Sequence, residues 1–243
     1  MKNALPTTNA PTTSTGMHIS PTTIDLQGVL SALHAGAKVA LLLRHSERPP
    51  IDHDDPEFGK DLPLTPRGIE WALALGHALH GLPDASFSAS PMTRCRLTAH
   101  HIALGMGYAN PIVHDADALG VHGFYYEDPL AVQKYMRQQG FMPYMLDYLN
   151  TGLAPHSRPI GPATQQLAAW LQQQTTAALG IYVSHDIFIA SFLTYFQMRT
   201  FSAENWLGFL HGAALLHTPA MGWQCHAFAP NLIHPTIPTQ FMR

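Results

Sequence analysis

The stretch Val39-Ala-Leu-Leu-Leu-Arg-His-Ser-Glu-Arg-Pro-Pro50 decides the fold. Its first five residues are apolar without a break, which is typical of a strand buried on both faces of a parallel sheet. The run stops at Arg44-His45, and Pro49 and Pro50 prevent a regular helix from starting at once. A cation and an imidazole therefore lie where a buried strand becomes a loop, which is where ligands bind in open α/β sheets.

Two later segments have the same character. An expected strand at 85–89 leads into a helix that Ser90 can cap and Pro91 can begin, with Arg94 near its first turn. Backbone N–H groups at that end of a helix favour an anion. A buried strand at 181–184 ends in His185-Asp186. Because the carboxyl ends of parallel strands share one edge, we expect the three segments to meet there.

The remaining segments alternate between helix and strand. We expect a helix capped by Thr23 and closed by Gly36, and another that begins at Thr65-Pro66 and ends at Gly81. Further helices are expected at 162–179 and 187–197, and strands at 111–113, 213–218 and 224–229. The pattern predicts an α/β protein: a three-layer αβα sandwich with a mostly parallel central sheet and a small inserted cap at 115–160.

Composition limits what this chain of 243 residues can do. It is 46% hydrophobic, only 12% charged, and carries a formal net charge of −3, which argues against a nucleic-acid partner. The sequence has neither a run of about 18 apolar residues nor a secretory signal, so no membrane partner is expected. Two cysteines are too few for a disulfide framework, which favours a cytoplasmic location.

The first 22 residues are rich in Thr, Pro, Asn and Ser, and this composition predicts a disordered tail ahead of a single domain at 23–243. Whether translation starts at Met1 or Met17 is left open by the sequence. Whether the chain forms a homo-oligomer is left open by the sequence.

Three short motifs resemble a known family. Arg44-His-Ser-Glu-Arg-Pro-Pro50 resembles the R-H-G-x-R-x-P signature of the histidine phosphatase superfamily, specifically its acid-phosphatase-like branch, with Ser46 in place of glycine. The L-T-x-x-G pattern at 64–68 and the S-x-x-x-R-[AC]-x-x-T-A element at 90–99 are also similar to that family. The resemblance covers about residues 38–200.

The resemblance implies a role for each residue at the predicted edge. His45 would be the nucleophile, and Arg44, Arg48, Arg94 and His185 would bind the phosphate. Asp186 matches the general acid of the acid-phosphatase-like branch. In the phosphoglycerate-mutase-like branch, which is closer in chain length, a glutamate of the insertion is the acid, and Glu127 is that alternative.

The predicted function is hydrolysis of a small phosphate monoester through a phosphohistidine, without a cofactor or metal. A phosphomutase and a non-catalytic phosphate-binding module are the alternatives. His77 and His80 have a spacing that fits a metal site, but a solvent-exposed helix face explains them better. The tyrosines and methionines of the cap either line a substrate pocket or pack within the cap.

Overall fold

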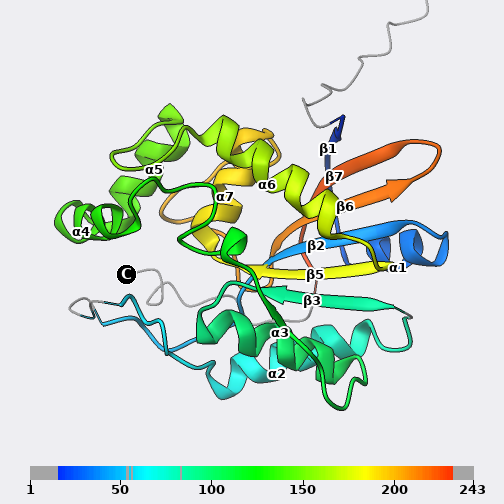
Figure 1. Cartoon of the computed structure of the whole chain (residues 1–243). Helices are drawn as coiled ribbons and strands as arrows, with labels where there is room; N and C mark the ends of the chain where they lie inside the picture. The colour runs from blue at the N-terminus through cyan, green and yellow to red at the C-terminus, as the bar shows by residue number, and fades with distance from the viewer. Residues whose placement is uncertain (1–15, 53–54, 56, 83, 232–243) are drawn as a thin grey trace, which may run out of the picture.

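The computed structural model describes residues 16–52, 55, 57–82 and 84–231. Within them the strands form one seven-stranded sheet in the order β1-β7-β6-β2-β5-β3-β4 (Figure 1). Only β6 runs antiparallel to its neighbours β2 and β7, so the mostly parallel sheet is confirmed. The strands are β1 (His18–Ile24), β2 (Lys38–Arg44), β3 (Ala85–Ala89), β4 (His114–Asp115), β5 (Leu179–Ser184), β6 (Gly212–Thr218) and β7 (Gly222–Phe228).

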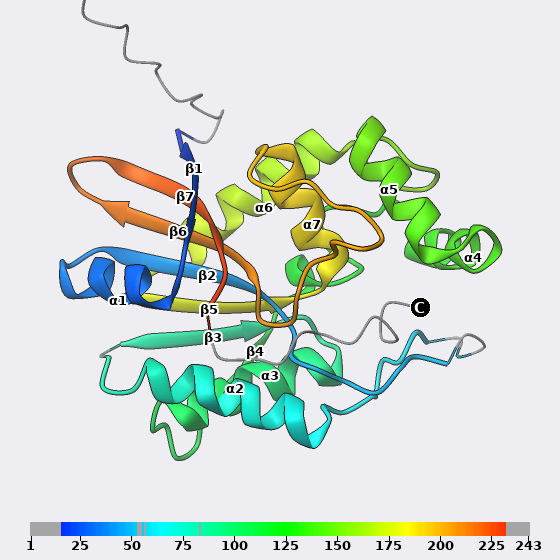
Figure 2. The ribbon, with the colours of Figure 1, turned by 180° about the vertical axis from the view of Figure 1, so that it is seen from behind.

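Helices cover both faces of this sheet, which confirms the αβα sandwich (Figures 1 and 2). One apolar cluster joins a face of the sheet to α1 (Leu26–His34), α2 (Pro66–Ala78) and α3 (Thr93–Gly105). A second cluster joins the other face to α4 (Pro129–Gln139), α5 (Phe141–Thr151), α6 (Ile160–Gln174) and α7 (Asp186–Tyr195). None of the helices in the described part of the chain is long and apolar enough to cross a membrane.

Strand β2 lies in the middle of the sheet, and its side chains from Val39 to Leu43 have no exposed surface. It pairs in parallel with β5, where Arg44 is opposite Ser184, and β5 pairs in parallel with β3, where Val183 is opposite Ala89. The ends of the three strands are therefore adjacent. The segments that follow these strands, which contain the predicted polar residues, therefore lie together at one edge of the sheet.

Helix α2 begins as its sequence predicts. The Thr65 side chain accepts a hydrogen bond from the backbone N–H of Gly68 at 3.0 Å, and Pro66 is the first helical residue. The fixed φ of proline and the capping hydroxyl both favour a helix start at this point. The helix ends at Ala78, before the predicted Gly81.

Two predicted helix caps are wrong, because each of the two residues forms hydrogen bonds within the sheet instead. Thr23 lies in β1, and the side chain of Asp25 caps α1 instead, accepting from the Gly28 N–H at 2.9 Å. Ser90 extends the line of β3, since its N–H donates to the Val183 carbonyl at 2.9 Å. Helix α3 consequently begins only at Thr93.

Other predicted boundaries shift by a few residues. The helix expected at 162–179 is α6, and Leu179 already belongs to β5. The helix expected at 187–197 is α7, and the strand expected at 111–113 is the two-residue β4. The predicted cap holds a 3₁₀ turn η1 (Asp117–Leu119) with α4 and α5, and its apolar side chains share one cluster with α6 and α7.

The predicted disordered tail is wrong for the residues next to the domain. Residues 18–24 form β1, which pairs in parallel with β7 and makes an edge of the sheet. Met17 is fully buried in the cluster beneath α6 and α7. Polar composition misled the prediction, because an edge strand needs few apolar side chains when backbone bonds hold it to its neighbour. Residues 1–15 lie outside the described residues.

We expect Met17→Ala to lower the free energy of unfolding by about 2–5 kcal/mol, the usual cost of truncating a buried methionine. Met221→Ala is the matched control, since the Met221 side chain is 54% exposed in the turn between β6 and β7. Urea unfolding of both variants measures the difference. Equal stability of the two would show that Met17 contributes no core packing.

Candidate active site

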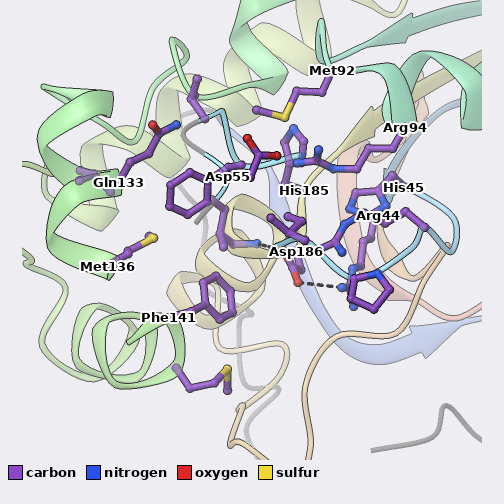
Figure 3. A pocket seen from close by; sticks show the side chains of 18 of the residues that line it. Arg44, His45, Asp55, Met92, Arg94, Gln133, Met136, Phe141, His185 and Asp186 are labelled. Atoms are coloured by element: carbon purple, nitrogen blue, oxygen red, sulfur yellow. Dashed lines mark hydrogen bonds and ion pairs between the residues drawn. The ribbon is translucent and has the colours of Figure 1, made fainter. Parts of the chain in front are cut away.

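The predicted residues of the sheet edge lie around one cavity of about 530 Å³. His45 follows β2, His185 follows β5, and Arg94 projects from the first turn of α3. Figure 3 shows these side chains beside Arg44 and Asp186, and Arg48 also lines the cavity. The alternative acid is not brought to them, because Glu127 is exposed and does not line the cavity.

The backbone holds His45 in place and fixes its tautomer. Its N–H donates to the Ser184 carbonyl at 3.0 Å, which continues the pairing of β2 with β5. Ring Nδ1 lies 2.8 Å from the Ser46 carbonyl oxygen, which can only accept, so Nδ1 carries the proton. Burial, followed by the charges of Arg94 and Arg44, lowers the pKa of His45 well below its usual value. The imidazole is therefore neutral, with a lone pair on Nε2.

Arg44 is a buried cation with a fixed orientation. Its guanidinium pairs with the Asp186 carboxylate at 2.9 Å, donates to the Leu207 carbonyl, and lies over the Phe209 ring at 4.3 Å from its centroid. Burial lowers the pKa of Arg44, whereas the charge of Asp186 raises it. An arginine stays protonated under such shifts, so the site keeps this positive charge.

Arg94 determines the protonation of the second histidine. Its guanidinium donates to the Gly59 carbonyl at 2.8 Å and to Nδ1 of His185 at 3.2 Å. Because arginine can only donate, Nδ1 of His185 carries no proton. Nε2–H then donates to the Ser90 hydroxyl at 2.8 Å. Burial and the charge of Arg94 lower the pKa of His185 well below its usual value, so this ring is neutral too.

Arg48 completes a group of three arginines. It donates to the Pro49 carbonyl at 2.7 Å, and burial together with the charge of Arg94 lowers its pKa to about 10. Among the residues that the structure describes, the buried Nε–H groups of Arg44, Arg48 and Arg94 have no acceptor. Buried donors without a partner are costly. An anion with several oxygens, such as phosphate, is the ligand that would satisfy them.

A comparison with protein-family models matches residues 40–119 to the model described as histidine phosphatase superfamily (branch 1). The matched segment contains His45 and the three arginines. This segment, about a third of the chain, is therefore similar to the histidine phosphatase superfamily. The match gives no support to the narrower prediction of the acid-phosphatase-like branch. It ends before Glu127 and Asp186, so it does not bear on which of the two is the acid.

Solved structures of other proteins have a similar fold. The mycobacterial glucosyl-3-phosphoglycerate phosphatase is 15% identical, with a TM-score of 0.53 over 80% of this chain and 100% of its own. Mycobacterial hydrolase 2 is 14% identical, with a TM-score of 0.52 over 84% and 95% of the two chains. YhfR of Bacillus stearothermophilus is 13% identical, with a TM-score of 0.50 over 78% and 95%. At these identities the likeness concerns the fold alone. No curated protein matches.

Within the histidine phosphatase motif, the serine that replaces glycine is well accommodated. Ser46 does not have a positive φ, so the substitution causes no backbone strain. Its hydroxyl donates to the Gly68 carbonyl at 2.7 Å, and its N–H donates to Thr98 Oγ1 at 2.9 Å. A Cβ at Gly68 would lie 2.1 Å from the Glu47 carbonyl oxygen. Only glycine at position 68 lets α2 approach the histidine motif so closely.

Sequence reasoning missed the role of Glu47. Its carboxylate is buried, accepts from the Thr65 hydroxyl at 2.7 Å, and forms an ion pair with Arg67. The Thr65 N–H also donates to the Glu47 carbonyl at 3.0 Å. The position of Glu47 between the histidine and the second arginine of the motif was the only available signal. These bonds attach the loop after His45 to the start of α2.

Asp186 is held as a carboxylate. Its Oδ2 accepts from Arg44 and, at 3.0 Å, from Trp206 Nε1, while Oδ1 accepts from the Ile187 N–H at 3.0 Å. Burial by itself would raise the pKa of Asp186, but Arg44, the Trp206 hydrogen bond and Arg48 outweigh it. The net pKa is therefore below its usual value. In the absence of a bound ligand, Asp186 is therefore ionised, and its carboxylate orients the Arg44 guanidinium.

The cap contributes a mainly apolar wall to the same cavity. Among the cap residues singled out in the sequence, Tyr126, Met136 and Met142 line it. The hydroxyl of Tyr126 is buried and has no hydrogen-bond partner in the described part of the chain. The other cap tyrosines pack away from the cavity; Tyr144, for example, bonds Ser157 Oγ at 2.6 Å. Some of the cap tyrosines and methionines thus line the cavity, whereas others pack within the cap.

Other polar residues weighed in the sequence lie outside this chemistry. The Cys95 thiol is buried, and burial raises its pKa to about 12, so it stays protonated and a poor nucleophile. His77 and His80 are exposed on and after α2. Among the described residues, no group of three or more His, Cys, Asp or Glu side chains is placed to hold a metal ion.

Proposed function

We propose that the protein hydrolyses phosphate monoesters through a phosphohistidine formed on His45. The observation that supports this most is a neutral imidazole, with its Nε2 lone pair free of the proton, beside three buried arginines. A neutral imidazole is the nucleophilic form. The arginines can hold the phosphate oxygens, and their rigid forks of donors suit the charge of the transition state.

The proposed reaction has two steps. In the first, Nε2 of His45 attacks phosphorus, the N–P bond forms, and the ester P–O bond breaks. The leaving oxygen takes a proton from the Asp186 carboxyl group and departs as the alcohol. In the second, water attacks phosphorus and gives a proton to the Asp186 carboxylate, the N–P bond breaks, and inorganic phosphate leaves. His45 is then neutral again, and the net change is one water consumed.

Asp186 must gain a proton before it can serve as the acid. Arg44 and Trp206 favour its carboxylate form. A phosphate dianion bound among the arginines opposes their charge and so raises the pKa of Asp186. His185, whose Nε2–H donates to Ser90, adds a donor to the phosphate only if that bond is exchanged. Its contact with Arg94 gives it a second role, because Nδ1 orients the guanidinium.

We expect phosphate release from p-nitrophenyl phosphate to survive prolonged treatment with a chelator, because arginines supply the positive charge around the phosphate. Vanadate or tungstate, as phosphate mimics, should inhibit. Activity that disappears with the chelator and returns with a divalent cation would contradict the mechanism.

The same assay separates the alternatives. A phosphomutase would move the phosphoryl group to another hydroxyl and release little inorganic phosphate, because its site must exclude water. A non-catalytic module would bind vanadate but release no phosphate from any monoester.

A further inference from the structure

The cavity has two chemically different sides. Arg44, Arg94 and the two histidines form one side, whereas Met136 and Phe141 project from α4 and α5 on the other (Figure 3). The apolar side draws on segments far apart in the sequence: Phe58, Met92, Met136, Phe141, Met142 and Trp206. A bound phosphate would therefore direct its alcohol portion toward hydrocarbon and aromatic side chains. Resting on the phosphatase activity proposed above, we propose that the substrate is the phosphate monoester of an apolar alcohol, alkyl or aryl.

The polar groups of the apolar side are mostly occupied by the protein itself. The Asp55 carboxylate accepts from the N–H groups of Glu57 at 2.8 Å and Gly59 at 2.7 Å. Arg137 donates to the Asp55 carbonyl at 2.8 Å and lies over the Phe58 ring at 4.8 Å from its centroid. These contacts join the loop after β2 to the cap helix α4 and engage part of the bonding capacity that a sugar hydroxyl would need.

Few donors remain for a polar substrate. The Tyr126 hydroxyl and Arg137 Nε are buried without a partner in the described part of the chain, and the Gln133 amide also lines the cavity. Such a set suits an alcohol with one or two oxygen atoms. A hexose phosphate would bury several hydroxyls against methionine and phenylalanine, where only some of them would find a hydrogen-bond partner, which is unfavourable. We therefore expect sugar phosphates to bind less well than phosphate esters of apolar alcohols.

The charges on this side disfavour a second anionic group. Asp52 and Asp55 both line the cavity, and among the described residues that line it Arg137 is the one cation outside the arginine group. A carboxylate or second phosphate placed beside these two side chains would meet groups of like charge. The cavity volume of about 530 Å³ lies within the range of pockets that enclose small ligands, so there is room for more than the phosphate.

A homologous series of n-alkyl phosphates, from ethyl to octyl, tests the proposal. All members leave as similar alkoxides, so the chemistry stays constant and the rate differences report on contacts with the alcohol portion. We expect kcat/KM to rise by about fourfold per added methylene until the apolar side is covered. Glycerol 3-phosphate and glucose 6-phosphate, with alkoxide leaving groups of the same kind, should lie at the bottom of the range.

A variant of the apolar side provides a second, independent readout. Phe141 is 37% exposed and stacks edge-on against Trp206 at 5.8 Å between centroids, so its truncation is tolerated by the fold. Phe141→Ala should lower kcat/KM for hexyl phosphate about tenfold, the effect of losing roughly 50 Å² of apolar contact, and change ethyl phosphate little. Leu130→Ala is the matched control, since Leu130 on α4 is 76% exposed and does not line the cavity.

The outcomes separate this proposal from the proposed function. The apolar substrate class would be overturned if p-nitrophenyl phosphate is hydrolysed but kcat/KM does not rise with alkyl chain length, or if sugar phosphates are preferred. Either result would leave the proposed phosphatase activity standing. Failure to hydrolyse any of these esters would overturn the proposed function and this inference with it. A rising series whose slope is reduced by Phe141→Ala and unchanged by Leu130→Ala would support the proposal.

Discussion

His45→Ala is expected to abolish turnover, by about 10⁴-fold or more, and to abolish the phosphoenzyme completely. A backbone bond fixes the tautomer of this imidazole: Nδ1–H donates to the Ser46 carbonyl at 2.8 Å, which leaves the lone pair on Nε2 for attack. Without it, the arginines can still bind phosphate, so vanadate binding should persist. Single-turnover reaction with a ³²P-labelled monoester, followed by acid treatment, measures the acid-labile phosphohistidine.

Two controls make the result interpretable. His77→Ala removes an exposed histidine of α2 and should leave turnover unchanged. Removal of the His45 ring leaves the buried Ser46 carbonyl without its donor, which costs about 1–3 kcal/mol of stability. The variant should therefore melt somewhat earlier but keep its circular dichroism spectrum. Labelled phosphate trapped on any other residue would refute the assignment of the nucleophile.

Asp186→Asn is expected to slow alkyl phosphates far more than p-nitrophenyl phosphate. An alkoxide is a poor leaving group that needs a proton in the transition state, and general acid catalysis contributes roughly 10²–10⁴-fold. A nitrophenolate leaves without that help. Because Asp186 also pairs with Arg44 at 2.9 Å, both substrates should lose some rate through a less well oriented guanidinium. The difference between the two substrates is the part that reports on the acid.

Glu127→Gln serves as the comparison, and we expect it to affect neither substrate, because Glu127 is exposed outside the cavity. The pH dependence gives a second check. The protonated fraction of Asp186 grows as pH falls, while the lowered pKa of His45 keeps the nucleophile neutral below pH 6.5. Alkyl phosphate hydrolysis should therefore rise on mild acidification. A selective loss with Glu127→Gln would transfer the acid role away from Asp186.

Much of the sheet edge that carries the candidate site could be predicted, because its signals are local. An unbroken apolar run predicted β2, and the parallel arrangement then brought Arg44, His45, Arg94 and His185 together. A capping threonine followed by proline predicted the start of α2 equally well. Each of these features depends on a few neighbouring residues and on general rules of chain geometry.

What could not be predicted depends on contacts between distant segments. The ion pair of Glu47 with Arg67 spans 20 positions, and the Arg137 contact with Asp55 spans 82. The wall of the cavity is likewise assembled from separate loops and helices, so no sequence period indicates it. Strand β1 was missed because its bonds to β7, about 200 residues away, compensate for its polar composition.

The position of β2 between β5 and β6 has a consequence for how the protein moves. A strand hydrogen-bonded on both sides exchanges its amide hydrogens only when the whole sheet opens, so its local stability approaches that of the entire domain. His45, the proposed nucleophile, directly follows that strand. Helices α4 and α5 carry part of the apolar side of the cavity and are joined to α6 and α7 by packed side chains, not by strand pairing. The arginine side of the cavity is therefore anchored to the centre of the sheet, whereas the apolar side is anchored by side-chain packing between helices.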